Sequence, residues 1–114
     1  MIVWQKAMDL TVLIYKITIK LPKEEIYSLT NQMRRSAVSI PSNIAEGQVR
    51  NSTKEYIQFL RIAQGSRAEL ETQILICQKI GYLSDVDIFD IINLTEEIGK
   101  MISSMIVKLK NKDG

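Results

Sequence analysis

The sequence predicts an all-α protein, an antiparallel up-and-down four-helix bundle that forms one domain over residues 1–114. Apolar residues recur at alternating spacings of three and four, which is the period of an amphipathic helix. The chain has only five glycines and two prolines, about half the usual share, so few turns are available. Long helices joined by short loops pack as antiparallel neighbours, and a chain of 114 residues suits a single core.

The first helix is expected to stop at Leu21, because the residue before Pro22 is disfavoured in helical dihedrals. Pro22 suits the start of the second helix, which we expect to end near Gly47, a residue type that favours the position after a helix. Pro41 lies inside this segment and lacks a backbone N–H, so we expect a kink or a short break around residues 39–41. The predicted apolar positions are Val3, Ala7, Leu10, Ile14, Ile17 and Leu21, then Ile26, Leu29, Met33, Ala37, Ile40 and Ile44.

The third helix is expected to begin after a capping side chain within residues 51–53 and to end at Gly81. Ser84 is predicted to cap the fourth helix, and residues 110–114 are expected to be frayed. The apolar positions of the third helix are Tyr56, Phe59, Ala63, Ser66, Leu70, Ile74 or Gln73, Cys77 and Ile80. Those of the fourth helix are Ile88, Ile91, Thr95, Ile98, Ile102, Met105 and Leu109.

The composition argues against catalysis and against a bound metal or cofactor. The chain has no histidine, which removes imidazole acid–base chemistry, Ser-His triads and histidine metal ligands. Glu69 and Glu71 are two residues apart and point to different faces of a helix. Cys77 lies on an apolar stripe, where a thiol behaves as a small hydrophobe, and no glycine-rich phosphate loop is present. We therefore expect no enzyme, no metal site and no cofactor.

The lone Cys77 cannot form a disulfide within the chain, so a reducing cytoplasm is the expected compartment. Residues 1–6 lack a signal-peptide pattern, and no apolar run reaches about 18 residues. We expect neither export by that route nor a membrane-spanning segment.

Charge is distributed unevenly although the formal net charge is only +2. Residues 1–67 carry a net +5, residues 68–97 a net −6 and residues 98–114 a net +3. All five arginines fall between Arg34 and Arg67. Such asymmetry indicates either a basic binding face or a basic surface that meets an acidic one in self-assembly.

The second helix has a polar face of mostly short, uncharged side chains that also carries Arg35. Arginines with serines and asparagines suit a phosphate backbone, and we take Arg35, Arg50, Lys54 and Arg61 as candidate nucleic-acid contacts. The alternative is a helix interface in an oligomer, where small polar side chains permit close approach. This face comprises Ser28, Asn31, Gln32, Arg35, Ser39, Ser42, Asn43 and Glu46.

Other residues favour structural roles. Arg34 falls at the edge of the apolar arc, where we expect a carboxylate partner, either Glu69 or Glu46. Gly65 and Ser66 lie among small residues of the third helix and are expected to pack closely in the core or between subunits. The lysines near the C-terminus suit the negative end of the last helix, with nucleic-acid contact as the alternative; these are Lys108, Lys110 and Lys112.

Three runs of residues carry a resemblance to a known family: Gln-Met-Arg-Arg-Ser at 32–36, Ser-Ile-Pro-Ser-Asn-Ile-Ala-Glu-Gly at 39–47, and Ala-Gln-Gly-Ser-Arg-Ala-Glu-Leu-Glu at 63–71. Together they resemble the four-helix bundle proteins encoded in intervening sequences of bacterial 23S rRNA genes. The resemblance covers about residues 2–110. It implies a bundle fold, a bacterial cytoplasmic origin and no known catalytic activity.

The resemblance also implies partners. A group similar in fold, the accessory variability determinants of diversity-generating retroelements, forms barrel-shaped homopentamers that bind nucleic acid and a reverse transcriptase. By that likeness the chain is expected to form a homo-oligomer, with a pentamer as the implied assembly and with RNA or DNA and a reverse transcriptase or other protein as partners. Residues that match the motif, with structural and ligand-binding roles both open, are Arg34, Arg35, Asn43, Glu46 and Gly47.

The function expected from sequence is therefore a non-enzymatic homo-oligomer that binds RNA or DNA through the basic face. The alternative is a scaffold or accessory oligomer without nucleic-acid contact, in which the basic block of one subunit meets residues 68–97 of the next.

Overall fold

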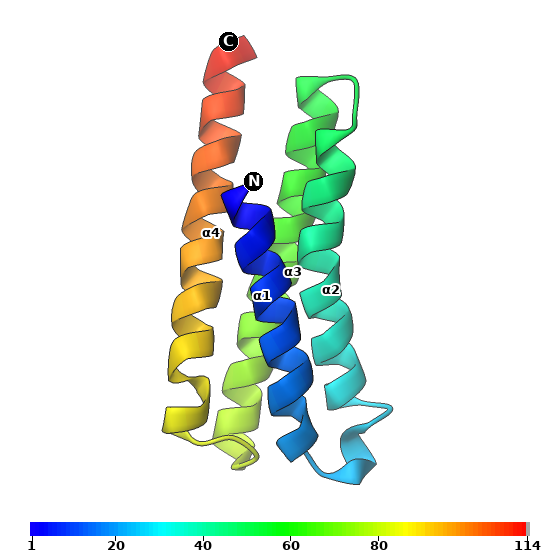
Figure 1. Ribbon diagram of the computed structural model, residues 1–114, viewed down its shortest axis with the longest axis vertical. Helices are drawn as coiled ribbons and strands as arrows, with labels where there is room; N and C mark the ends of the chain where they lie inside the picture. Colours follow the sequence, from blue (N-terminus) through cyan, green and yellow to red (C-terminus); the bar gives the residue numbers. More distant parts are fainter. Residues whose placement is uncertain (114) are drawn as a thin grey trace.

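The structure, a computed structural model, describes residues 1–113, and these form long helices without a β-strand (Figure 1). The helices are α1 (Ile2–Ile17), α2 (Leu29–Gln48), α3 (Thr53–Ile80) and α4 (Asp85–Asp113). Two 3₁₀ segments, η1 (Thr18–Lys20) and η2 (Lys23–Glu25), connect α1 to α2. The helices run alternately up and down in a bundle of 48 × 24 × 19 Å, which confirms the predicted all-α four-helix bundle.

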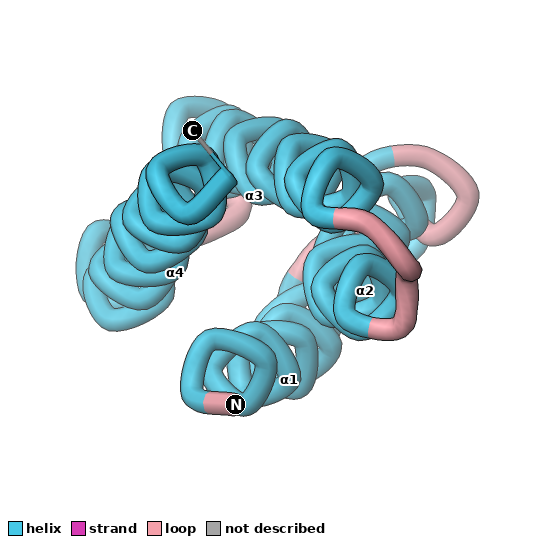
Figure 2. Tube along the Cα trace, turned by 90° about the horizontal axis from the view of Figure 1, so that it is seen from above, coloured by secondary structure: helices cyan, strands magenta, loops and turns pink. Residues whose placement is uncertain are grey.

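Each helix packs against its two neighbours around the bundle, with α2 between α1 and α3 and with α4 closing the ring against α1 (Figure 2). The helix α1 is the shortest. Near the C-terminus the other three helices therefore extend past the start of α1 (Figure 1). The connection between α2 and α3 lies at this end, and the connection between α3 and α4 lies at the opposite end.

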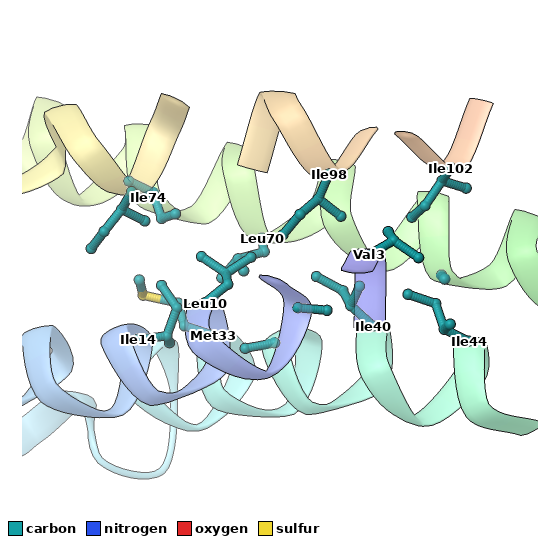
Figure 3. Packing of buried hydrophobic residues seen from close by; sticks show 14 of the residues in the cluster. Val3, Leu10, Ile14, Met33, Ile40, Ile44, Leu70, Ile74, Ile98 and Ile102 are labelled. Carbon is teal, nitrogen blue, oxygen red and sulfur yellow. The ribbon is translucent and has the colours of Figure 1, made fainter. Parts of the chain in front are cut away.

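The core consists of the predicted apolar stripes, which interdigitate along the bundle axis (Figure 3). Two predicted core residues are instead exposed, Ile26 at 49% and Ile80 at 56%. Ile26 falls between η2 and α2, so the helical period does not apply to it. Ile80 ends a 28-residue helix, over which the true period drifts by about 20° per heptad away from a 3.5-residue stripe. Leu60, which the stripe omitted, is fully buried.

The predicted caps are present. The Ser52 hydroxyl accepts a hydrogen bond from the Glu55 N–H at 3.1 Å, and Ser84 accepts one from the Asp87 N–H at 3.1 Å. Gly81 ends α3 with a φ of 98°, a left-handed conformation that favours glycine.

Several predicted boundaries were wrong. α1 ends at Ile17, and the chain then tightens into η1 before Pro22. α2 begins at Leu29 rather than at Pro22, because η2 and a turn intervene. α4 is helical through Asp113, three residues beyond Lys110, where fraying was expected to begin, and Gly114 lies outside the described residues.

Pro41 does not break α2, which is helical without interruption from Leu29 to Gln48. Proline leaves the carbonyl four residues earlier, that of Ala37, without its helical donor. The Thr11 Oγ1 atom of α1 lies 3.1 Å from this oxygen and 2.8 Å from the Ala7 oxygen. The single hydroxyl proton of Thr11 is shared between the Ala7 and Ala37 carbonyls, so the neighbouring helix compensates in part for the missing N–H.

Replacing Thr11 by Val is expected to cost about 1–2 kcal/mol of unfolding free energy, because the Ala37 carbonyl loses its donor inside the bundle. Denaturant unfolding measures this cost. In the Pro41→Ala variant, the backbone N–H of residue 41 can donate to the Ala37 carbonyl. Thr11→Val should therefore lower the free energy of unfolding by less in that variant than in the unaltered protein.

Thr72→Val is the matched control, since the exposed Thr72 hydroxyl bonds the Ala68 carbonyl within an unbroken stretch of α3. It should change stability by less than about 0.5 kcal/mol. Equal costs of Thr11→Val with and without Pro41 would contradict this role.

Candidate nucleic-acid interface

Helices α2 and α3 are joined by a line of small polar side chains, the α2–α3 seam, made of Ser36, Ser39, Asn43, Ser66 and Glu69. Ser36 Oγ donates to Glu69 Oε1 at 3.0 Å, and the Ser39 and Ser66 hydroxyl oxygens are 2.8 Å apart. Asn43 Nδ2 donates to the Ser39 carbonyl at 2.8 Å and to its hydroxyl at 2.9 Å. Much of the polar face of α2 is therefore used inside the protomer.

Gly47 continues the seam, and its predicted role was wrong. It lies inside α2 rather than after the helix, and it is buried. A Cβ atom on Gly47 would lie 2.9 Å from Tyr56 Cδ1 and 3.0 Å from Phe59 Cβ. Glycine is required here because α3 approaches the α2 backbone closely.

Within the protomer Gly65 does not pack closely, so the core alternative was wrong, and the expected contact between subunits stays a prediction. Gly65 is exposed, and a Cβ atom there would meet no atom within 4 Å. Its neighbour Ser66 does face α2, so only one of the two residues belongs to the helix contact.

Arg34 has no carboxylate partner among the described residues, which corrects the expected pairing. Its Nε donates to Thr18 Oγ1 at 3.0 Å and its Nη2 to the Tyr15 carbonyl at 3.3 Å, and the guanidinium lies 4.7 Å from the centre of the Tyr15 ring. The side chain thus turns toward α1, whereas Glu69 lies on the α3 side. Glu46 instead pairs with Arg50 at 3.0 Å.

Arg35 lies apart from the other candidate contacts. It is exposed and forms no ion pair within the part of the chain that the structure describes. Together with Asn31, Arg34 and Ser42 it lines a shallow groove beside α1, which Tyr15 borders. This groove lies on the side of the bundle, between α1 and α2.

The remaining candidates Arg50, Lys54 and Arg61 lie at the end of the bundle where α2 passes into α3. The last turns of α4 end at the same place and add three lysines (Figure 1). Arg61 and Lys110 line one groove between α3 and α4, over the small residues Gly65 and Ala68. We call this cluster the basic end: Arg50, Lys54, Arg61, Lys108, Lys110 and Lys112.

Most charges of the basic end are unneutralised. Arg50 pairs with Glu46 and lies 4.6 Å from the centre of the Phe59 ring. The other five cations are exposed and form no ion pair with any side chain that the structure describes. Sequence reasoning assigned the three lysines first to the negative end of the last helix, with nucleic-acid contact as the alternative. The bundle topology places Lys110 beside Arg61.

The opposite end of the bundle is net acidic: five acids, Glu24, Glu25, Asp85, Asp87 and Asp90, lie there with three lysines, Lys20, Lys23 and Lys79. There Lys20 Nζ lies 2.6 Å from Asp87 Oδ1. The hydrogen bond from Lys20, together with the Ser84 N–H, lowers the pKa of Asp87 to about 2. The molecule is therefore electrically polar along its long axis.

Arg67 is internal to the fold and does not add to either cluster. Its Nε donates to Gln64 Oε1 at 2.8 Å and its Nη1 to Glu71 Oε1 at 3.1 Å. The guanidinium lies over Gly99, where a Cβ would be only 2.6 Å from Arg67 Nε. Arg67 thus orients Gln64 and Glu71 of its own helix, and these two residues bond the Gly99 carbonyl and the Thr95 hydroxyl of α4.

Cys77 is buried, and its Sγ lies 3.6 Å from Met33 Sδ. Burial, with a smaller contribution from the charge of Glu25, raises the pKa of the thiol to about 11. Over residues 1–113, none of the helices combines the length and apolar character needed to cross a bilayer.

Comparisons with known proteins give a matching family and similar solved structures. The family described as 23S rRNA-intervening sequence protein matches residues 1–104. A crystal structure of a protein with unknown function from the S23 ribosomal protein family of Bacteroides thetaiotaomicron VPI-5482 is similar, with 27% sequence identity and a TM-score of 0.82. The similarity covers 91% of this chain and 97% of that chain. No curated protein matches the sequence.

Gly47→Ala is expected to destabilise the protein by about 1–3 kcal/mol, because the added methyl forces α2 away from Tyr56 and Phe59. Gly65→Ala is the matched control and should stabilise by about 0.5–1 kcal/mol, since alanine is the better helix former and the site is open. The denaturant concentrations at which the two variants are half unfolded measure these changes in stability. Equal shifts of the same sign would show that the α2–α3 approach is not limited by Gly47.

Proposed function

The chain belongs to the 23S rRNA-intervening sequence protein family, and from this premise we propose that it binds RNA or DNA through the basic end of its bundle, without catalysis. The observation that carries the proposal is the gathering of six cations from α2, α3 and α4 at one end, five of them without an acidic partner among the described side chains. Unpaired cations held this close raise the free energy of the bundle by mutual repulsion, which a polyanion relieves.

We expect the cations of the basic end to contribute unequally to phosphate binding. Arg61 and Lys110 border one groove, so a phosphate lying in it meets both charges. Lys54 follows the Ser52 cap at the start of α3, where the helix dipole also favours an anion. Arg50 contributes less because Glu46 already neutralises it, and Arg35 contributes less because it lies on the side of the bundle. Contacts of this kind recognise the phosphate backbone rather than a base sequence.

We also propose that the protein is a cytoplasmic homo-oligomer and that it assembles as the pentamer that the resemblance implies. A specific observation favours protein contacts as well: several large apolar side chains on α1 are exposed, among them Ile2 at 63% and Val12 at 51%. A scaffold that binds another protein, such as a reverse transcriptase, without touching nucleic acid is therefore the second candidate function.

Fluorescence anisotropy with a labelled RNA hairpin and a DNA duplex, at about 50 and 200 mM salt, tests nucleic-acid binding. The double variant Arg61→Gln/Lys110→Gln should weaken binding at low salt. It should also flatten the plot of log affinity against log salt by roughly 0.9 per lost phosphate contact on duplex DNA.

The control removes two charges of the same sign elsewhere, in Lys23→Gln/Lys79→Gln. Both lysines are exposed and lie near the acidic end. Loss of affinity in both double variants alike would indicate a net-charge effect, and no binding by the unaltered protein at 50 mM salt would leave the scaffold function.

A further inference from the structure

Helix α1 has a second apolar face that no part of the described chain covers. Besides the buried stripe, four large side chains of α1 point outward, and at 100° per residue they fall within an arc of about 80°. Ile19 of η1, which follows α1 directly, is exposed as well. Their exposed fractions range from 36% for Trp4 to 77% for Ile19. We call them the α1 stripe: Trp4, Met8, Val12, Tyr15 and Ile19.

The α1 stripe borders α2, because Thr11 and Tyr15 contact α2 on that side. Val38 of α2, exposed at 40%, adds to the same face. The apolar area of such a set is on the order of 500 Å², which is near the upper limit for a monomer surface. A stable interface buries roughly 800 Å² on each partner, so the α1 stripe and its polar margin suffice for one.

The charges beside the α1 stripe define what can cover it. Arg34 is stacked on Tyr15, and Arg35 lies in the groove beside it. Neither guanidinium has a carboxylate partner among the described residues. The covering surface must therefore be apolar and must carry an acid.

Helix α3 presents a surface of this kind. Ile62 and Ile76 are exposed at 47% and 42%, and Glu69 lies midway between them at heptad spacing. Glu69 accepts a hydrogen bond from Ser36 but forms no ion pair with any described side chain. Ile80, exposed at 56%, extends what we call the α3 stripe: Ile62, Glu69, Ile76 and Ile80.

We propose that the α1 stripe is a subunit interface and that the α3 stripe of a second copy covers it, with Arg35 of one subunit facing Glu69 of the next. The inference rests on the proposed homo-oligomer and names its contact surfaces. Because the two stripes are different surfaces, the contact is heterologous, and repetition of it closes into a ring or grows as a filament.

Pairing of two α1 stripes about a two-fold axis is less favourable. Arg34 and Arg35 lie beside Tyr15, toward the C-terminal end of the stripe, and the α1 stripe of a second copy contains no carboxylate that could pair with them. The α3 stripe instead supplies an acid, which compensates a charge that the single protomer leaves unpaired.

Two variants with one altered surface each test the proposal by light scattering and sedimentation. Met8→Glu disrupts the α1 stripe and Ile76→Glu disrupts the α3 stripe, at side chains that are each 42% exposed. Each variant alone should be a monomer. A mixture of the two should form a 1:1 heterodimer and nothing larger, because one α1 stripe and one α3 stripe remain intact.

Val107→Glu is the matched control, since Val107 is 55% exposed on the groove between α3 and α4 and should leave the assembly unchanged. Circular dichroism should show an unchanged helix content in all three variants. Arg35→Glu and Glu69→Arg should each weaken the assembly, and the double variant should restore it.

The outcomes are distinguishable. A monomeric unaltered protein would overturn the homo-oligomer together with this interface, whereas nucleic-acid binding is read independently by anisotropy. An unaltered oligomer that survives Met8→Glu or Ile76→Glu would overturn the interface alone. Loss of assembly in Met8→Glu but not in Ile76→Glu would show that α1 stripes pair with one another or with a different surface, which also overturns the proposal.

Discussion

The close approach of α2 to α3 is the constraint on which the rest of the structure depends. Ser39 and Ser66 touch across the contact, and Gly47 leaves no room for a side chain against Tyr56. Small residues along this line fix the rotation of α2 about its axis. Once that rotation is set, Arg34 and Arg35 must face α1 and solvent, and the turn after Gln48 must deliver Arg50 and Lys54 to the end of the bundle.

The fold thereby separates its arginines into three groups with different chemistry. Arg67 donates hydrogen bonds to Gln64 and Glu71, and these two residues bond α4. Arg34 is positioned by Tyr15 and Thr18 but keeps its charge unpaired, and Arg61 stands free beside Lys110. A protomer that neutralises its charges so incompletely is suited to partners: a polyanion at the basic end and an acidic, apolar surface at α1.

The helical period and the scarcity of turn residues were enough to predict the bundle, because each helix buries a continuous stripe. The end of α3 at Gly81 and the start of α4 after Ser84 are encoded by these residues themselves. Long-range geometry was not accessible in this way. Nothing near Pro41 indicates that Thr11 will supply the missing donor, and the same residue type serves close packing at Gly47 and open surface at Gly65. The candidate site was only partly predicted for the same reason: Arg61 is recognisable as a cation, but its neighbour Lys110 is a product of topology.

Hydrogen exchange read by mass spectrometry, with and without a saturating RNA hairpin at low salt, tests most directly whether the basic end is the nucleic-acid surface. We expect slower amide exchange in residues 50–61 and 104–112 on binding, and no change in residues 23–28 or 81–90 at the acidic end. Protection at the acidic end, or binding that leaves both segments of the basic end unprotected, would contradict the assignment.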